Sequence, residues 1–334
     1  MKPSELKALI KSRHVAGLKR AIYMVASPGV GKTQLAAQVA SELGIGFKAI
    51  HAPLLQPEDY GMPVVTGAKK DILKFIVSAE KFPLEGSDCP DQGFFLIDEM
   101  PQADASAQKI LANLIQEREI HGHKLKEGWT ILATGNRQSD RSGANRILGH
   151  LSDRVTEVPF EVSLDDWTQW ALENEVKTEI VAFIRFRPSL LTNYDPKNAK
   201  NATPRSWVEG VNASLGVIPS ALEFQTFSGD VGEGPASEFL AFLKIFRNLP
   251  NPDAILLNPK KEKVPTDAAT QYAICGALIA RVNEDSFGKI MEYIKRMPPE
   301  FSVLFVRDAI SKCNDIATTK AFIDWASKEG KGLL

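Results

Sequence analysis

A glycine-containing loop between an apolar run and a helical pattern is the feature that most constrains this chain. Residues 26–33 read Ala-Ser-Pro-Gly-Val-Gly-Lys-Thr, and they follow the apolar run 21–25 and precede the helix-like stretch 34–40. A strand, a glycine loop and a helix in this order predict a phosphate-binding loop (P-loop), whereas the same letters alone would describe a turn. Ala26 stands where the motif has glycine, and a small residue there still permits the turn.

The loop also predicts how a nucleotide would be held. The backbone N–H groups of residues 28–33 would surround the phosphates, and the helix N-terminus would add its positive end. Lys32 would reach the β- and γ-phosphates, and the hydroxyl of Thr33 would bind Mg²⁺. We therefore expect ATP and Mg²⁺ as cofactors. The expected nucleotide contacts are Pro28, Gly29, Val30, Gly31, Lys32, Thr33 and Gln34.

A second motif supports this prediction. Residues 93–99 read Gly-Phe-Phe-Leu-Ile-Asp-Glu, an apolar run that ends in two carboxylates. Such a run is typical of a buried strand in a parallel sheet, and open α/β sheets bind ligands at the carboxyl ends of their strands. Asp98 would hold Mg²⁺ through water, beside Thr33. Glu99 would be the general base that polarises the attacking water.

The composition limits the class of protein and its partners. At 334 residues, the chain is long enough for about two domains, and its 44% hydrophobic and 24% charged residues are typical of a globular protein. Forty basic and 41 acidic residues give a net charge of −1. This balance argues against an overall nucleic-acid footprint but leaves room for a local basic patch.

Three features favour a cytoplasmic protein. The cysteines, Cys89, Cys275 and Cys313, show neither metal-binding spacing nor a disulfide framework, which fits a reducing compartment. Residues 1–7 mix charges and lack the apolar core of a signal peptide. No apolar run approaches membrane-spanning length, so we expect no membrane partner.

The pattern of apolar residues changes near residue 161. Before it, strand-like runs alternate with helical patterns, which predicts a parallel sheet with covered faces, and Asp104 is the expected N-cap of a helix over 105–118. The predicted strands are 21–25, 47–51, 93–98, 130–134 and 155–160. The helices predicted after residue 161 are 164–173, 176–187, 204–213, 235–247, 268–282, 286–296 and 317–328. The predicted loops are 193–198, the glycine-rich helix-entry loop 227–234, and 249–253.

Further motifs follow in an order that is typical of a known family. The chain resembles an AAA+ ATPase, and within that group it resembles the MoxR-type branch. The motifs that carry the resemblance, across about residues 20–215, are Ser27–Thr33, Leu55–Gly61, Phe95–Glu99, Leu132–Asn136, Leu151–Arg154 and Thr203–Arg205. The resemblance implies an α/β fold: a P-loop AAA+ parallel-sheet domain over residues 1–160, and an α-helical lid with a C-terminal helical region over 161–334.

The resemblance also implies roles for residues outside the first two motifs. Asn136 would orient the attacking water or contact the γ-phosphate, as sensor 1. Arg154 would point into the nucleotide of a neighbouring subunit as an arginine finger, and Arg146 is the rival for this role. Arg205 would reach from the lid to the γ-phosphate as sensor 2, on a helix capped by Thr203. The expected catalytic residues are Lys32, Glu99, Asn136, Arg154 and Arg205.

Residues 119–128 are predicted to form a hairpin, because Ile120 and Leu125 flank a turn that contains glycine. The segment resembles the pre-sensor-1 hairpin of the same clade. Its two histidines have no further ligand nearby in the sequence and are expected to be polar residues of the tip, while its two lysines could contact an acidic partner or a phosphate. These residues are His121, His123, Lys124 and Lys126.

The leading hypothesis is an ATP-hydrolysing motor of MoxR type that remodels a protein partner. By family analogy, ATP would bind between subunits of a homo-oligomeric ring, expected to be a hexamer. MoxR-type ATPases often act with proteins that carry a von Willebrand A domain, so a protein of that kind is a candidate client. The main alternative is a nucleic-acid motor of helicase or translocase type. A monomeric P-loop kinase and a nucleotide-gated scaffold are further alternatives, and the acid at Glu99 argues against the scaffold.

Overall fold

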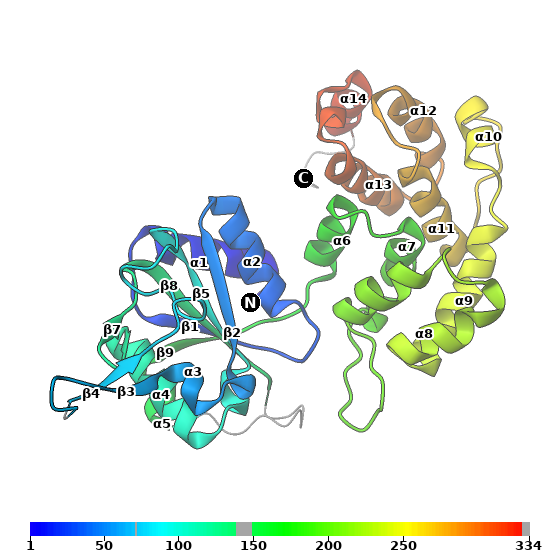
Figure 1. Ribbon diagram of the computed structural model, residues 1–334. Helices are drawn as coiled ribbons and strands as arrows, with labels where there is room; N and C mark the ends of the chain where they lie inside the picture. The colour runs from blue at the N-terminus through cyan, green and yellow to red at the C-terminus, as the bar shows by residue number, and fades with distance from the viewer. Residues whose placement is uncertain (71, 138–148, 329–334) are drawn as a thin grey trace. The chain divides into compact units, whose positions relative to one another are not determined.

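The computed structural model of the protein describes residues 1–70, 72–137 and 149–328. The chain divides into two compact units, Met1–Val162 and Ser163–Leu334 (Figure 1). The first is called the sheet unit below, and the second the helical unit. Among the described residues, no helix is both long enough and apolar enough to cross a membrane.

A five-stranded parallel sheet forms the centre of the sheet unit. Its strand order is β2-β5-β8-β1-β9, and every neighbouring pair runs parallel. The strands are β1 (Ala21–Val25), β2 (Gly46–His51), β5 (Gln92–Asp98), β8 (Gly128–Gly135) and β9 (Val155–Pro159). All five predicted strands are confirmed to within two residues at each end.

Side chains alternate across this sheet, and both faces are buried. On β1, Ile22 and Met24 enter one apolar cluster, whereas Ala21 and Tyr23 enter the other. Burial on both faces explains why the strands read as nearly continuous apolar runs. The helices that contribute to the clusters are α1 (Pro3–Val15) and α2 (Lys32–Leu43) on one face and α4 (Ala105–Glu117) on the other.

The predicted cap of α4 is present, because the side chain of Asp104 accepts a hydrogen bond of 2.7 Å from the N–H of Ala107. Shorter helices of the sheet unit are α3 (Pro57–Tyr60), α5 (Gly149–Ser152) and the 3₁₀ turns Ala52–Leu54 and Met100–Gln102.

Two antiparallel hairpins lie outside the main sheet. The predicted one is confirmed as β6 (Glu119–Ile120) and β7 (His123–Lys124); both residues of its turn, His121 and Gly122, have positive φ, as a two-residue hairpin turn requires. The other was not predicted and consists of β3 (Met62–Thr66) and β4 (Ile72–Ile76).

All regular secondary structure in the described part of the helical unit is helical. Its α-helices are α6 (Leu164–Glu173), α7 (Thr178–Phe186), α8 (Glu223–Val231), α9 (Glu233–Arg247), α10 (Pro252–Leu257), α11 (Ala268–Ile279), α12 (Glu284–Ile294), α13 (Pro299–Lys312) and α14 (Lys320–Lys328). Its other turns are a π-helix at Ser206–Asn212 and 3₁₀ turns at Pro188–Leu190, Ser220–Leu222 and Asn314–Thr318.

The predicted loop 227–234 is wrong. Phe227 and Val231 are both buried, so this stretch forms the second half of α8 despite its glycines. Only Gly232, with φ of 91°, interrupts the helical conformation between the end of α8 and the start of α9. Helix α13 was missed, and α10 begins inside the predicted loop 249–253.

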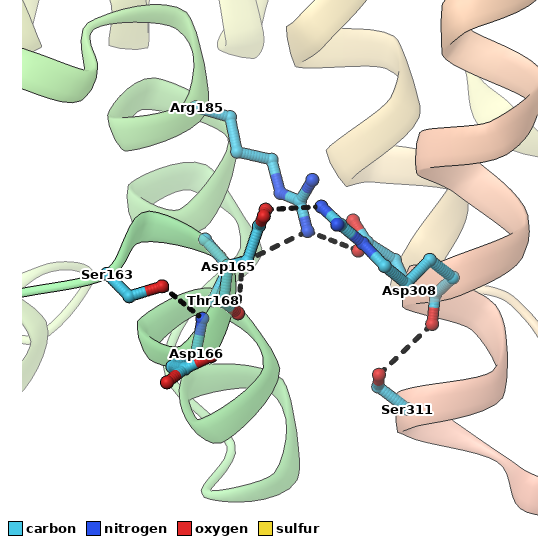
Figure 2. Close-up of polar contacts among 8 residues, drawn as sticks. Ser163, Asp165, Asp166, Thr168, Arg185, Asp308 and Ser311 are labelled. Carbon is cyan, nitrogen blue, oxygen red and sulfur yellow. Dashed lines mark hydrogen bonds and ion pairs between the residues drawn. The ribbon is translucent and has the colours of Figure 1, made fainter. Parts of the chain in front are cut away.

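A buried ion pair joins α7 to α13 within the helical unit. A guanidinium N–H of Arg185 donates to Asp308, and another contact at 3.2 Å reaches the hydroxyl of Thr168 on α6 (Figure 2). The side chains of Arg185 and Asp308 are only 5% and 6% exposed. Burial raises the pKa of the Asp308 carboxyl, while the charge of Arg185 acts in the opposite direction. A second pair, between Arg307 of α13 and Asp165 of α6, is exposed.

We predict that Arg185→Met and Asp308→Leu each lower the free energy of unfolding by about 3–5 kcal/mol, because each leaves one buried charge without a partner. The double variant is expected to recover most of this loss. Urea unfolding of the full chain at neutral pH measures both effects. Removal of the exposed Arg307–Asp165 pair is the control, with a cost of at most about 1 kcal/mol. Additive losses in the double variant of the buried pair would contradict this account.

Candidate nucleotide site

The glycine loop follows β1 and ends where α2 begins. Gly29 and Gly31 have φ of 75° and 91°, in the left-handed region that glycine enters without steric cost. Gly31 is also the N-cap of α2, and no described side chain caps this helix end. A helix N-terminus without a side-chain cap can bind an anion, as expected for a P-loop.

Lys32 connects this loop to the end of β8. Its Nζ donates to the carbonyl oxygens of Ala26 and Ser27, and to Oδ1 of Asn136, each at 3.1 Å. Lys32 is 8% exposed and Asn136 is 6% exposed. The lysine of the first motif and the predicted sensor 1 residue, 104 positions apart, therefore lie in direct contact.

Thr33 connects the loop to the end of β5. Its hydroxyl donates to Oδ2 of Asp98 at 3.1 Å. A hydroxyl and a carboxylate at this separation are the hard oxygen donors that Mg²⁺ prefers. The residues predicted to hold the metal are thus adjacent, and their chemistry fits that ion.

Glu99 follows β5 and is held at its backbone and its side chain. Its N–H donates to Oγ1 of Thr134 at 3.0 Å, and its Oε2 lies 3.2 Å from Nε2 of His51. Its φ of 54° is unusual for a residue other than glycine. In the sheet, His51 at the end of β2 pairs with Asp98, which explains why its ring reaches the next residue.

Sequence reasoning missed both His51 and Thr134 as site residues. Each stood inside a predicted strand, 47–51 and 130–134, and each is close to the carboxyl end of that strand. The signal was a polar residue at a strand end. It becomes informative only when the strand order shows that β2 and β8 both flank β5.

The predicted arginines are placed differently. Arg154 precedes β9 in the sheet unit and is partly buried, and among the described residues none accepts a side-chain hydrogen bond from it. Arg146 lies outside the described residues. Arg205 belongs to the helical unit, where its side chain is 51% exposed and its Nε lies 4.0 Å from Glu209. The segment 204–213, predicted as an α-helix, contains the π-helix Ser206–Asn212. At its start, the hydroxyl of Thr203 accepts a hydrogen bond of 3.1 Å from the N–H of Ser206.

The hairpin β6–β7 is less basic at its surface than predicted. Nζ of Lys126 contacts the carbonyl oxygen of Cys89 and lies 3.5 Å from Asp91, and its side chain is only 16% exposed. The other lysine, Lys124, is exposed. The two histidines attach the hairpin to β4, because His121 stacks on Phe75 with ring centroids 4.1 Å apart and Nε2 of His123 lies 2.9 Å from the carbonyl oxygen of Phe75.

Comparison with known families agrees with this geometry. Residues 22–160 match the family described as "ATPase family associated with various cellular activities (AAA)". Residues 22–160 are therefore similar to an AAA-family ATPase domain. Proteins of this family bind ATP, and the matched segment contains the glycine loop, Asp98, Glu99, Asn136 and Arg154.

The solved structures that match this chain share little of its sequence and superimpose on it with low TM-scores. A point mutant of Thermotoga maritima RuvB is 15% identical, with a TM-score of 0.39 over 88% of this chain and 85% of that one. The T. maritima RuvB Holliday junction branch migration motor is also 15% identical, with a TM-score of 0.38 over 88% and 86%. NtrX from Brucella abortus is 13% identical, with a TM-score of 0.33 over 98% of this chain and 67% of NtrX. No curated protein matches the sequence significantly.

Proposed function

We propose that this protein is an ATP-hydrolysing motor of MoxR type that remodels a protein partner. Two contacts carry the proposal: Lys32 with Asn136, and Thr33 with Asp98. Each contact joins residues from two separately predicted motifs. They support a single nucleotide site made from the glycine loop and the ends of β5 and β8.

In this proposal each residue has one task. Lys32 and the loop N–H groups bind the phosphates, and Thr33 and Asp98 hold Mg²⁺. When bound, that ion offsets phosphate charge during transfer. Glu99 accepts the proton of the attacking water as general base. The amide of Asn136 orients that water, and its contact with Lys32 keeps it next to the phosphate end of the loop.

Two arginines would complete the site. Arg154 has a guanidinium without a described acceptor in its own chain, which suits a residue that serves the nucleotide of a neighbouring subunit. Such arginine fingers contribute about 10³–10⁵ in rate in GTPases. Arg205, in the helical unit, would sense the γ-phosphate from the lid. In these roles they would place ATP at the interfaces of a homo-oligomeric ring, a hexamer by the resemblance to MoxR-type ATPases.

A protein client is favoured over a nucleic acid by the surface of the sheet unit. Among described residues, five large apolar side chains of the β3–β4 hairpin are between 49% and 60% exposed, namely Met62, Val65, Ile72, Leu73 and Ile76. Exposed apolar patches mark protein–protein contact sites. In the β6–β7 hairpin, by contrast, contacts with Cys89 and Asp91 largely bury Lys126, and of the predicted lysine pair only Lys124 is exposed. A protein with a von Willebrand A domain is the candidate client that the resemblance suggests.

Lys32→Ala is predicted to abolish ATP binding, because the phosphates lose their buried cationic partner. Glu99→Gln is predicted to bind ATP with near-normal affinity but to turn it over at least about 100-fold more slowly, as expected for loss of a general base. Fluorescent-nucleotide titration and phosphate release measure the two properties. Lys124→Ala, on the exposed hairpin, is the control and should change neither. Equal loss of binding in both variants would contradict the assigned roles.

The active site is predicted to be shared between subunits. Arg154→Ala and Glu99→Gln should each be nearly inactive, yet an equal mixture should regain activity, since about one interface in four of a mixed cyclic ring would combine an intact Glu99 with an intact Arg154. Phosphate release measures the recovery, and native mass spectrometry verifies that mixed rings form. Mixed rings without recovery would exclude Arg154 as the finger and leave Arg146 as the candidate.

Added DNA is predicted to leave the ATPase rate unchanged at physiological salt, because only Lys124 of the predicted lysine pair in the β6–β7 hairpin is exposed. A nucleic-acid motor would instead show stimulation by DNA that falls steeply as salt rises, since each neutralised phosphate releases counterions. In that case Lys124→Ala would reduce the salt slope by about one unit. This outcome would overturn the protein-remodelling proposal and leave the ATPase site standing.

A further inference from the structure

Thr134 makes two hydrogen bonds that reach both acidic residues of the site. Its Oγ1 accepts from the N–H of Glu99 at 3.0 Å, and its hydroxyl donates to Oδ1 of Asp98. The residue is fully buried near the carboxyl end of β8. The Thr134 hydroxyl on β8 therefore contacts both Asp98, the last residue of β5, and Glu99, the residue after it.

The bond to Asp98 fixes the orientation of its carboxylate. Oδ1 is engaged by Thr134, and Oδ2 accepts from the hydroxyl of Thr33 at 3.1 Å. Each carboxylate oxygen of Asp98 thus has its own hydrogen-bond donor, Thr134 of β8 for Oδ1 and Thr33 of the glycine loop for Oδ2. With Oδ1 retained by Thr134, Oδ2 stays directed at the loop where the metal would bind.

The bond to Glu99 supports an unusual backbone conformation. With φ of 54°, Glu99 lies in the left-handed region, which costs energy for a residue with a Cβ and persists only where its surroundings enforce it. The hydrogen bond from the N–H of Glu99 to Thr134 is such an enforcing contact. Because the backbone conformation directs the Cα–Cβ bond, the same contact sets the direction in which the Glu99 side chain leaves the backbone, while His51 contacts its carboxylate.

Thr134 itself has little freedom to move. The next residue, Gly135, packs so closely that a Cβ added there would lie 2.1 Å from the hydroxyl oxygen of Tyr23 and 2.9 Å from Cγ of Pro101. In the sheet, Thr134 is paired with Met24 of β1. A rigid strand end therefore presents the hydroxyl at a fixed place.

We propose that Thr134 is the positioning residue of the site, and that its hydroxyl sets the direction of the Asp98 and Glu99 carboxylates. The inference rests on the proposed ATPase function. Thr134 touches neither nucleotide nor water in this account and acts only through the two acids. Its loss should therefore lower turnover much more than it weakens binding of ATP.

The test compares Thr134→Val, which keeps the shape of the side chain and removes the hydroxyl, with Thr134→Ser, which keeps the hydroxyl. Thr130→Val is the matched control, because Thr130 lies on the same strand, is also buried, and bonds to Nδ1 of His14 at 2.8 Å, away from the site. We expect Thr134→Val to lower kcat by about 10- to 100-fold, as for a misplaced catalytic group. KM for ATP should change less than about threefold, and Thr134→Ser should restore most of kcat.

A second readout needs no turnover. Amide hydrogen exchange of the Glu99 N–H, measured by NMR on the nucleotide-free chain, should accelerate at least about tenfold in Thr134→Val and stay near the unaltered rate in Thr134→Ser and Thr130→Val. Normal kcat and normal exchange in Thr134→Val, beside an active unaltered chain, would overturn this inference alone. An equal fall of kcat in Thr130→Val would also overturn it, since a general effect on the strand would then explain the loss. An unaltered chain that hydrolyses no ATP would remove both the proposed function and the inference.

Discussion

The contact between the glycine loop and the ends of two neighbouring strands determines the rest of this site. Because β8 lies between β5 and β1 in a parallel sheet, the loop after β1, the acids after β5 and the amide after β8 must all emerge at one edge. The Lys32–Asn136 and Thr33–Asp98 hydrogen bonds are the result. Two-sided burial of the sheet holds these strand ends in register, so the polar side chains at the strand ends meet the loop at one edge.

The sheet could be predicted from the sequence because each strand carries its own local signal. A predicted strand such as 93–98, whose apolar run ends in the two carboxylates Asp98 and Glu99, indicates both the strand and the position of its chemistry. The glycine loop adds its own order of strand, turn and helix. By contrast, the roles of His51 and Thr134 depend on which strands are neighbours, and neighbour order is a non-local property that a single sequence does not state.

Prediction was weaker in the helical unit for a related reason. The glycines of 227–234 favour a loop, but burial of Phe227 and Val231 overrides this local preference and extends α8 through them. In the sheet unit, helix α1 was missed as well, since only Leu6 and Ile10 of its 13 residues are fully buried and its apolar stripe is narrow. The Arg185–Asp308 pair could not be foreseen at all, because the two residues are 123 positions apart and meet only when α7 and α13 both pack against α6 and α11.

In the proposed function, Thr33 and Asp98 form one metal–nucleotide site with the glycine loop, and electron–nuclear double resonance with Mn²⁺ in place of Mg²⁺ detects such a site. With ATP added to the full chain, we expect a protein-bound Mn²⁺ signal with ³¹P couplings from the phosphates. We also expect this signal to be lost in Asp98→Ala combined with Thr33→Val. A bound Mn²⁺·ATP signal that is unchanged in this double variant would contradict the account, as would the absence of any bound signal in the unaltered chain.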